Sequence, residues 1–180
     1  MPARLKLAAQ AVAAVGVGVL AALLIWNLTH QTPPPKVGAP APAFSLHRLT
    51  GNGDLSLASF RGKTVVLNFF ASWCGPCKRE APDLERVWRD YHSRNVVVLG
   101  VDSNDARGDA LRFLRAHGIT YPVVSDPSES QALRYGIPGL PGTYVINSHG
   151  RVVGAEIAGP ISDQPFAKDF TRYLDAALKA

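Results

Sequence analysis

Cysteine is scarce in this chain. Its 180 residues include only two cysteines, Cys74 and Cys77. A small secreted scaffold held together by disulfides needs more cysteines, and it needs them spread along its length. That architecture is therefore excluded. Two neighbouring cysteines with no others indicate either redox chemistry or part of a metal site.

Other metal ligands are also too few or badly spaced. The cysteine pair supplies half of a tetrahedral zinc site, which needs four ligands. Haem attachment requires a histidine directly after the second cysteine, and this chain has Lys78 there. The histidines show no metal-ligand spacing: His30, His47, His92, His117 and His149. We therefore expect no metal and no cofactor.

Long runs of one charge are absent as well. The net charge is +5, but the sequence contains no run of five or more Lys/Arg and no alternation of basic and aromatic residues. Nucleic-acid binding is therefore not expected. Hydrophobic residues make up 47% of the chain and charged residues 18%, a balance that excludes global disorder.

Residues 7–28 carry no charge at all. As a helix this stretch spans roughly 33 Å, which is enough to cross the hydrocarbon core of a bilayer. Arg4 and Lys6 precede it, so residues 1–6 are expected to stay cytoplasmic while the remainder is exported. We expect an uncleaved single-pass anchor, because the run exceeds a signal-peptide core and residues 25–30 lack a small-x-small site. A cleaved signal peptide is the alternative.

Two further regions follow the apolar stretch. Residues 29–42 are rich in proline, which favours an extended spacer between membrane and domain. Residues 43–180 have the length of one globular domain, and we find no internal repeat in them.

Hydrophobic patterns within that domain predict alternating strands and helices. The nearly continuous apolar runs at 64–71 and 96–101 are typical of strands buried on both faces, as in parallel sheets. Asp105 is positioned to cap the helix that follows the second run. We expect strands at 44–46, 54–57, 64–71, 96–101, 121–124, 143–146 and 152–157, and helices at 76–93, 106–117, 128–135 and 163–178. This order predicts an α/β sheet with helices on both faces.

The two cysteines fall where the first buried strand gives way to a helix. Cys74 would lie at the helix N-terminus, where unpaired N–H groups and the helix dipole stabilise a thiolate. Pro76 suits the first helical turn, and the two-residue spacer brings both sulfurs within disulfide reach. This predicts Cys74 as the exposed nucleophile, which forms a mixed disulfide with substrate. Cys77 should be more buried and resolve that intermediate.

The segment Trp73-Cys74-Gly75-Pro76-Cys77-Lys78, directly after an apolar strand, resembles the active site of the thioredoxin superfamily. Segments 37–46, 68–73 and 136–146 are similar to the membrane-anchored TlpA/ResA/DsbE-type proteins of cytochrome c biogenesis. The resemblance covers roughly residues 37–178. It implies a thioredoxin-like fold, with a mixed sheet flanked by helices.

The same resemblance implies a function. A protein of this type is an extracytoplasmic thiol–disulfide oxidoreductase that reduces disulfides of exported proteins such as apocytochrome c. It receives electrons from a thiol-transferring partner in the membrane and needs no cofactor. We expect a monomer. The alternatives are thiol–disulfide exchange in another pathway, including an oxidising or isomerase role, and a metal-binding module or a structural Cys74–Cys77 disulfide.

A peroxiredoxin-like peroxidase is a further alternative. That family carries Thr or Ser three residues before its reactive cysteine, and Pro four residues earlier still. This chain has Ala71 and Leu67 at those positions.

The resemblance also implies a proton acceptor. Thioredoxins carry a buried acid on the strand before the active site, and this chain has Asn68 there. Glu80, three residues after Cys77, stands where the related proteins keep an acidic residue. It is the candidate for taking the proton from the resolving thiol. Position alone favours an ordinary solvated helix residue, and it is the resemblance that favours the role of proton acceptor.

Substrate contacts are implied at the loop before the next strand. Pro141 matches the cis-proline of the family, with Pro138 as the rival, and Leu140 would offer its backbone to an extended substrate segment. Gly142 departs from the polar or acidic residue expected there. Trp73 is either a contact surface for partner proteins or a lid over the site, and we favour contact.

Overall fold

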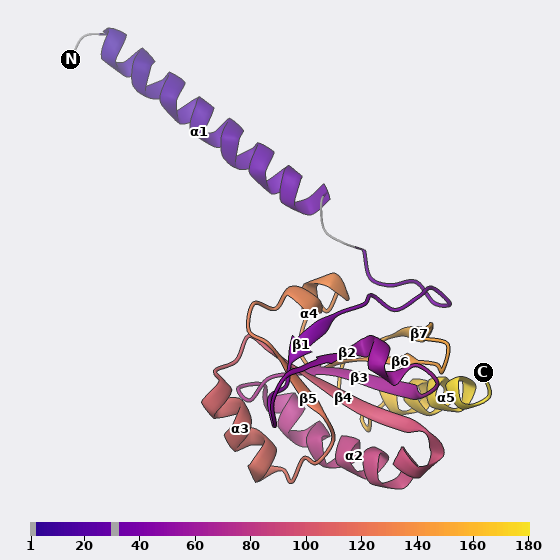
Figure 1. Cartoon of the computed structure of the whole chain (residues 1–180). Helices are drawn as coiled ribbons and strands as arrows, with labels where there is room; N and C mark the ends of the chain where they lie inside the picture. The colour runs from indigo at the N-terminus through magenta and orange to yellow at the C-terminus, as the bar shows by residue number, and fades with distance from the viewer. Residues whose placement is uncertain (1–2, 30–32) are drawn as a thin grey trace. The chain divides into compact units, whose positions relative to one another are not determined.

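The computed structural model describes residues 3–29 and 33–180 and, within the first helix, the side chains of residues 10–26. The chain divides into two compact units, residues 1–32 and residues 33–180 (Figure 1). The first unit contains a single helix, and the second contains the sheet and all remaining elements.

The first unit is the helix α1, Ala3–Thr29. Its described large apolar side chains are all more than half exposed, from Val12 at 73% to Val19 at 53%. Within the described residues, the chain contains no helix of sufficient length and hydrophobicity to span a bilayer. The predicted anchor, 7–28, extends past the described side chains at both ends, and residues 1–2 of the predicted cytoplasmic segment lie outside the described residues. The anchor therefore stays a prediction.

The second unit is built on a five-stranded mixed sheet with the order β5-β4-β3-β6-β7. The strands β3, β4 and β5 run parallel, and β6 and β7 are antiparallel additions on the other side of β3. Their bounds are β3 Thr64–Phe70, β4 Val96–Ser103, β5 Val123–Asp126, β6 Gly142–Ile146 and β7 Val152–Ile157. A separate hairpin joins β1, Ser45–His47, to β2, Asp54–Ser56. The predicted α/β class is confirmed.

Helices cover both faces of the sheet. One core cluster joins the sheet to α2 (Gly75–Tyr91), α3 (Arg107–Ala116) and α5 (Phe166–Leu178). A second cluster lies between the sheet, α4 (Ser130–Arg134) and the β1–β2 hairpin. Alternate β3 residues enter the two clusters, which explains why this strand is apolar along its whole length. Two short 3-10 helices complete the domain, η1 (Leu57–Phe60) and η2 (His92–Arg94).

The proline-rich segment is not simply a spacer. The Gly38 N–H donates to the Val152 carbonyl at 2.8 Å, and the Ala41 N–H donates to the Gly150 carbonyl at 3.0 Å. Because these bonds tie the segment to the start of β7, the compact unit begins at Pro33, earlier than the predicted boundary at residue 43. Residues 30–32 of the predicted linker 29–42 lie outside the described residues.

Candidate active site

The cysteines lie at the junction of β3 and α2. Cys74 is the N-cap of α2, and its Sγ accepts the Cys77 N–H at 3.2 Å. Pro76 occupies the first turn, where its missing N–H leaves no helical hydrogen bond unmade. A Cys74–Cys77 disulfide is formed, with the Cα atoms 5.3 Å apart. The predicted placement of the pair is confirmed. Sulfur at this position receives a backbone donor and the positive end of the helix dipole.

Both cysteines are covered in this oxidised form. Cys74 is 4% exposed and Cys77 is 2% exposed. The predicted exposure of Cys74 is therefore wrong, because the residue packs into the core cluster that also contains Phe70 and Ala81. Position along the helix, rather than a clear difference in exposure, distinguishes the two sulfurs.

Glu80 lies one turn beyond Cys77 and is 1% exposed, so it is not a solvated helix residue. The Asn68 side-chain amide donates to its Oε2 at 2.9 Å, and the Ile161 N–H donates to its Oε1 at 2.9 Å. Burial raises the pKa of Glu80 to about 7, while these two hydrogen bonds oppose the rise. A carboxyl group with this pKa can accept or return a proton near neutral pH.

The partners of Glu80 were missed in the sequence. Asn68 stands where thioredoxins carry an acid, and its amide also donates to the Thr143 hydroxyl at 2.9 Å. Thr143 lies on β6 and Ile161 follows β7, both far from Glu80 in sequence. No local pattern signals such contacts, because only the fold brings these segments together.

The loop before β6 contains the predicted cis peptide bond. The Leu140–Pro141 bond is cis, whereas the bond before Pro138 is not, so the choice of Pro141 is confirmed. Leu140 is half-buried and packs against the cluster that contains both cysteines. A second cis bond, Gln164–Pro165, was not predicted.

The turn before Cys74 is held by the end of β4. Trp73 is 58% exposed, and its Nε1–H donates to the Asn104 carbonyl at 2.9 Å. The Ser72 N–H donates to the Asp105 carboxylate at 2.6 Å. The predicted capping role of Asp105 is wrong, because the N-cap of α3 is Ala106 and Asp105 binds this turn instead. The exposed indole face is consistent with a contact surface for partner proteins.

Comparison with known proteins assigns this site to a family. Residues 37–155 match the family model described as AhpC/TSA. Thiol-disulfide oxidoreductase ResA of Halalkalibacterium halodurans is 34% identical over 69% of this chain and 70% of its own length. Thiol:disulfide interchange protein DsbE of Allochromatium vinosum is 34% identical over 83% of each chain. The chain belongs to the AhpC/TSA family and, within it, to the ResA- and DsbE-like thiol–disulfide oxidoreductases.

A solved structure agrees with this assignment. The crystal structure of a DsbE-type thiol:disulfide interchange protein from Chlorobium tepidum superposes with a TM-score of 0.72 at 30% identity. The match covers 80% of this chain and 99% of the other. The thioredoxin-like fold expected from the active-site segment is thereby confirmed.

Gly142 has a packing explanation in this oxidoreductase. A Cβ atom at this position would lie 2.8 Å from Glu156 Oε1 and 2.8 Å from Ile137 Cδ1. Glu156, on β7, therefore occupies the space that a side chain at residue 142 would fill. Burial raises the pKa of Glu156 to about 7.

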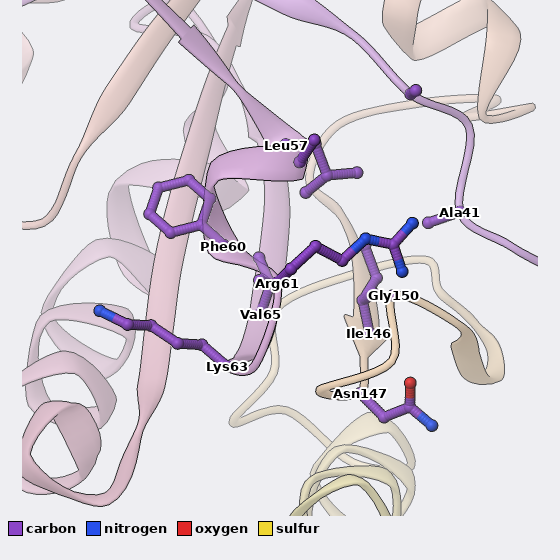
Figure 2. A pocket seen from close by; sticks show the side chains of 11 residues that line it. Ala41, Leu57, Phe60, Arg61, Lys63, Val65, Ile146, Asn147 and Gly150 are labelled. Carbon is purple, nitrogen blue, oxygen red and sulfur yellow. The ribbon is translucent and has the colours of Figure 1, made fainter.

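The oxidoreductase also has a pocket away from the cysteines (Figure 2). Val65 at the start of β3 and Ile146 at the end of β6 line it, whereas Cys74 follows the opposite end of β3. Arg61 extends toward Gly150 (Figure 2). Its guanidinium donates to the His149 carbonyl. This pocket is therefore separate from the redox site.

Proposed function

We propose that this oxidoreductase is anchored in the membrane with its catalytic domain outside the cytoplasm, where it reduces disulfides of exported proteins, apocytochrome c among them. The observation that carries the redox proposal is the position of Glu80, a buried carboxyl group with a pKa near 7 on the helix that begins with the cysteine pair. Such a group supplies what the resolving step needs, an acceptor for the Cys77 proton.

The reaction follows from the geometry. In the reduced protein, the Cys74 thiolate attacks one sulfur of a substrate disulfide and displaces the other as a thiolate, which takes a proton. Cys77 then gives its proton to Glu80 and attacks the Cys74 sulfur of the mixed disulfide. The second substrate thiol leaves, and the protein retains the Cys74–Cys77 disulfide. Two electrons from a thiol donor return it to the reduced state.

The reducing direction is supported by the Gly-Pro spacer, which the resembling family associates with reducing members. The apolar helix α1 supports a donor located in the membrane. Trp73 and Leu140 flank the cysteines and offer an aromatic face and a strand-like backbone to a protein substrate.

Trapping with Cys77→Ser tests the proposal. We expect the variant to accumulate a mixed disulfide through Cys74, because the step that releases substrate is removed. The measurement is non-reducing electrophoresis of the full chain from its native host, followed by identification of the captured protein. Capture of apocytochrome c supports the proposal.

Cys74→Ser is the matched control and should capture nothing. Trapping by Cys74→Ser rather than Cys77→Ser would reverse the assigned roles. Capture restricted to proteins that normally retain their disulfides would favour an oxidising or isomerase role.

The anchor is tested separately. We expect the exported full chain to sediment with membranes and to resist extraction by high salt, because about twenty apolar residues hold a helix in a bilayer. The measurement is fractionation with N-terminal sequencing of the mature protein. A soluble form that begins near residue 30 would show cleavage and would contradict the proposal.

A further inference from the structure

An acidic residue is buried at the end of β4, beside the active-site turn. Asp102 is 0% exposed and pairs in register with Phe70, the last residue of β3. It lies on the sheet face that α2 covers, since Val96 and Val98 of the same alternation belong to that cluster. Within residues 33–180, neither carboxyl oxygen of Asp102 receives a hydrogen bond from an N–H or hydroxyl group.

The group that faces Asp102 is a second carboxyl. The side chains of Asp102 and Asp105 lie within hydrogen-bonding range, and Asp105 also accepts the Ser72 N–H. Two carboxylates have no hydrogen to share, so this contact requires a proton on one of them. Burial, followed by the charge of Asp105, raises the pKa of Asp102 to about 8. Asp102 therefore carries the proton of this pair at neutral pH.

This arrangement links β4 to the nucleophile. The Asp102 carboxyl group interacts with Asp105, Asp105 accepts the Ser72 N–H, and Ser72 is two residues before Cys74. The neighbouring Asn104 carbonyl holds the Trp73 indole in the same turn. We propose that Asp102 and Asp105 form a proton-sharing acid pair that positions the active-site turn Ser72–Trp73. They act through this turn and are positioning residues.

Other ionisable side chains on the elements around Asp102 are either exposed or bound to other partners. On α2, Lys78 and Arg79 are exposed and Glu80 is bound by Asn68 and Ile161. On α3, Arg112 pairs with Asp109, and on β5 the Asp126 carboxylate accepts from the backbone of α4. Arg107 of α3 is exposed and donates to the Arg48 carbonyl. Asp105 is the charged group that acts on Asp102.

The acid pair makes the turn sensitive to alkaline pH. Once Asp102 loses its proton, two adjacent carboxylates repel each other, and the bond from Ser72 to Asp105 weakens. The environment of Trp73 then changes. The exchange reaction is slower than in a protein in which Asp102 and Asp105 still share a proton. Exchange with a generic protein disulfide reports this effect, so the test does not depend on the physiological substrate.

Asp102→Asn is the decisive variant, because its amide donates to Asp105 but carries no titrating proton. The measurements are Trp73 fluorescence and insulin-disulfide reduction between pH 6 and pH 9.5, using the full chain. The wild type should show a fluorescence step near pH 8 that Trp73→Phe abolishes, and Asp102→Asn should show none. The variant should match the wild-type rate at pH 6.5 and exceed it at least about threefold at pH 9. A threefold ratio is a smaller effect than the complete loss of one charge-assisted hydrogen bond would cause.

Asp105→Ala provides a second arm, because it removes the acceptor for Ser72 at a half-buried position. It should show the alkaline Trp73 signal at every pH, and it decides the matter alone if Asp102→Asn does not fold. Asp109→Asn, on the exposed side of α3, is the matched control and should keep the wild-type step. A wild-type step in Asp102→Asn, or wild-type behaviour in Asp105→Ala, would overturn the proposal.

Discussion

Among single residues, Glu80 combines burial with a hydrogen-bond donor at each carboxyl oxygen. The donors from Asn68 and Ile161 stabilise the ionised form, while burial disfavours it, and the balance leaves the pKa near 7. The carboxyl is consequently divided between its two protonation states at the pH where the exchange reaction runs. That division suits a group that first accepts and later returns a proton.

Glu80→Gln tests this role. We expect resolution of the mixed disulfide to slow by roughly 100-fold at pH 8, since an amide cannot take the Cys77 proton. In the wild type the step should accelerate as pH rises through about 7, because the ionised carboxyl is the active form, and the variant should lose this dependence. Stopped-flow mixing of the reduced protein with a disulfide peptide measures the rate. Asp90→Asn, exposed on the same helix, is the control, and an unchanged profile in Glu80→Gln would remove Glu80 from the mechanism.

Among the elements, β6 and β7 pack closely at Gly142, where the absence of a side chain leaves room for Glu156. Gly142→Ala would place a methyl group against Glu156 and Ile137, so we expect the free energy of unfolding to fall by about 1–3 kcal/mol. Urea denaturation measures the change. Gly139→Ala is the matched control, because a Cβ there meets no atom within 4 Å. Equal stability of the two variants would show that Gly142 is not required by packing.

The elements were largely predictable from sequence, and the exceptions have physical causes. Long apolar runs such as 64–71 identify buried strands because burial on both faces leaves few polar positions. β5 begins two residues later than expected, at Val123, since Tyr121 is buried by packing rather than by strand pairing. Asp105 was assigned to the nearer helix, yet the fold offered it the Ser72 N–H instead. Local patterns cannot foresee a partner supplied by a distant segment.

For the molecule as a whole, buried acids make stability depend on pH. The pKa values of Glu80, Asp102 and Glu156 are all raised by burial, so the folded protein holds protons that the unfolded chain has released. Stability from these groups is complete below their ordinary pKa values, near 4, and is lost as pH rises through about 7 to 8. We therefore expect the free energy of unfolding to be lower at pH 8 than at pH 5, as measured by urea denaturation.

Glu80→Gln combined with Asp102→Asn should reduce that dependence to the part contributed by Glu156, because both replacements stay neutral. Glu85 contributes a pH dependence of stability with the opposite sign. Hydrogen bonds from Thr120 and Arg89 lower its pKa against the effect of burial. Its contribution is lost at acid pH, below the window that the comparison covers. A protein that is equally or more stable at pH 8 would contradict the assignment of raised pKa values.

The low exposure of the Cys74–Cys77 disulfide affects which thiols can reduce it. Small thiols collide with a surface from which the sulfur atoms are almost absent, so most encounters are unproductive. We expect a protein partner that docks beside the Trp73 indole to stay long enough for the covering residues to move aside. Contact time, more than the abundance of a reductant, would then decide which thiols exchange with the Cys74–Cys77 pair.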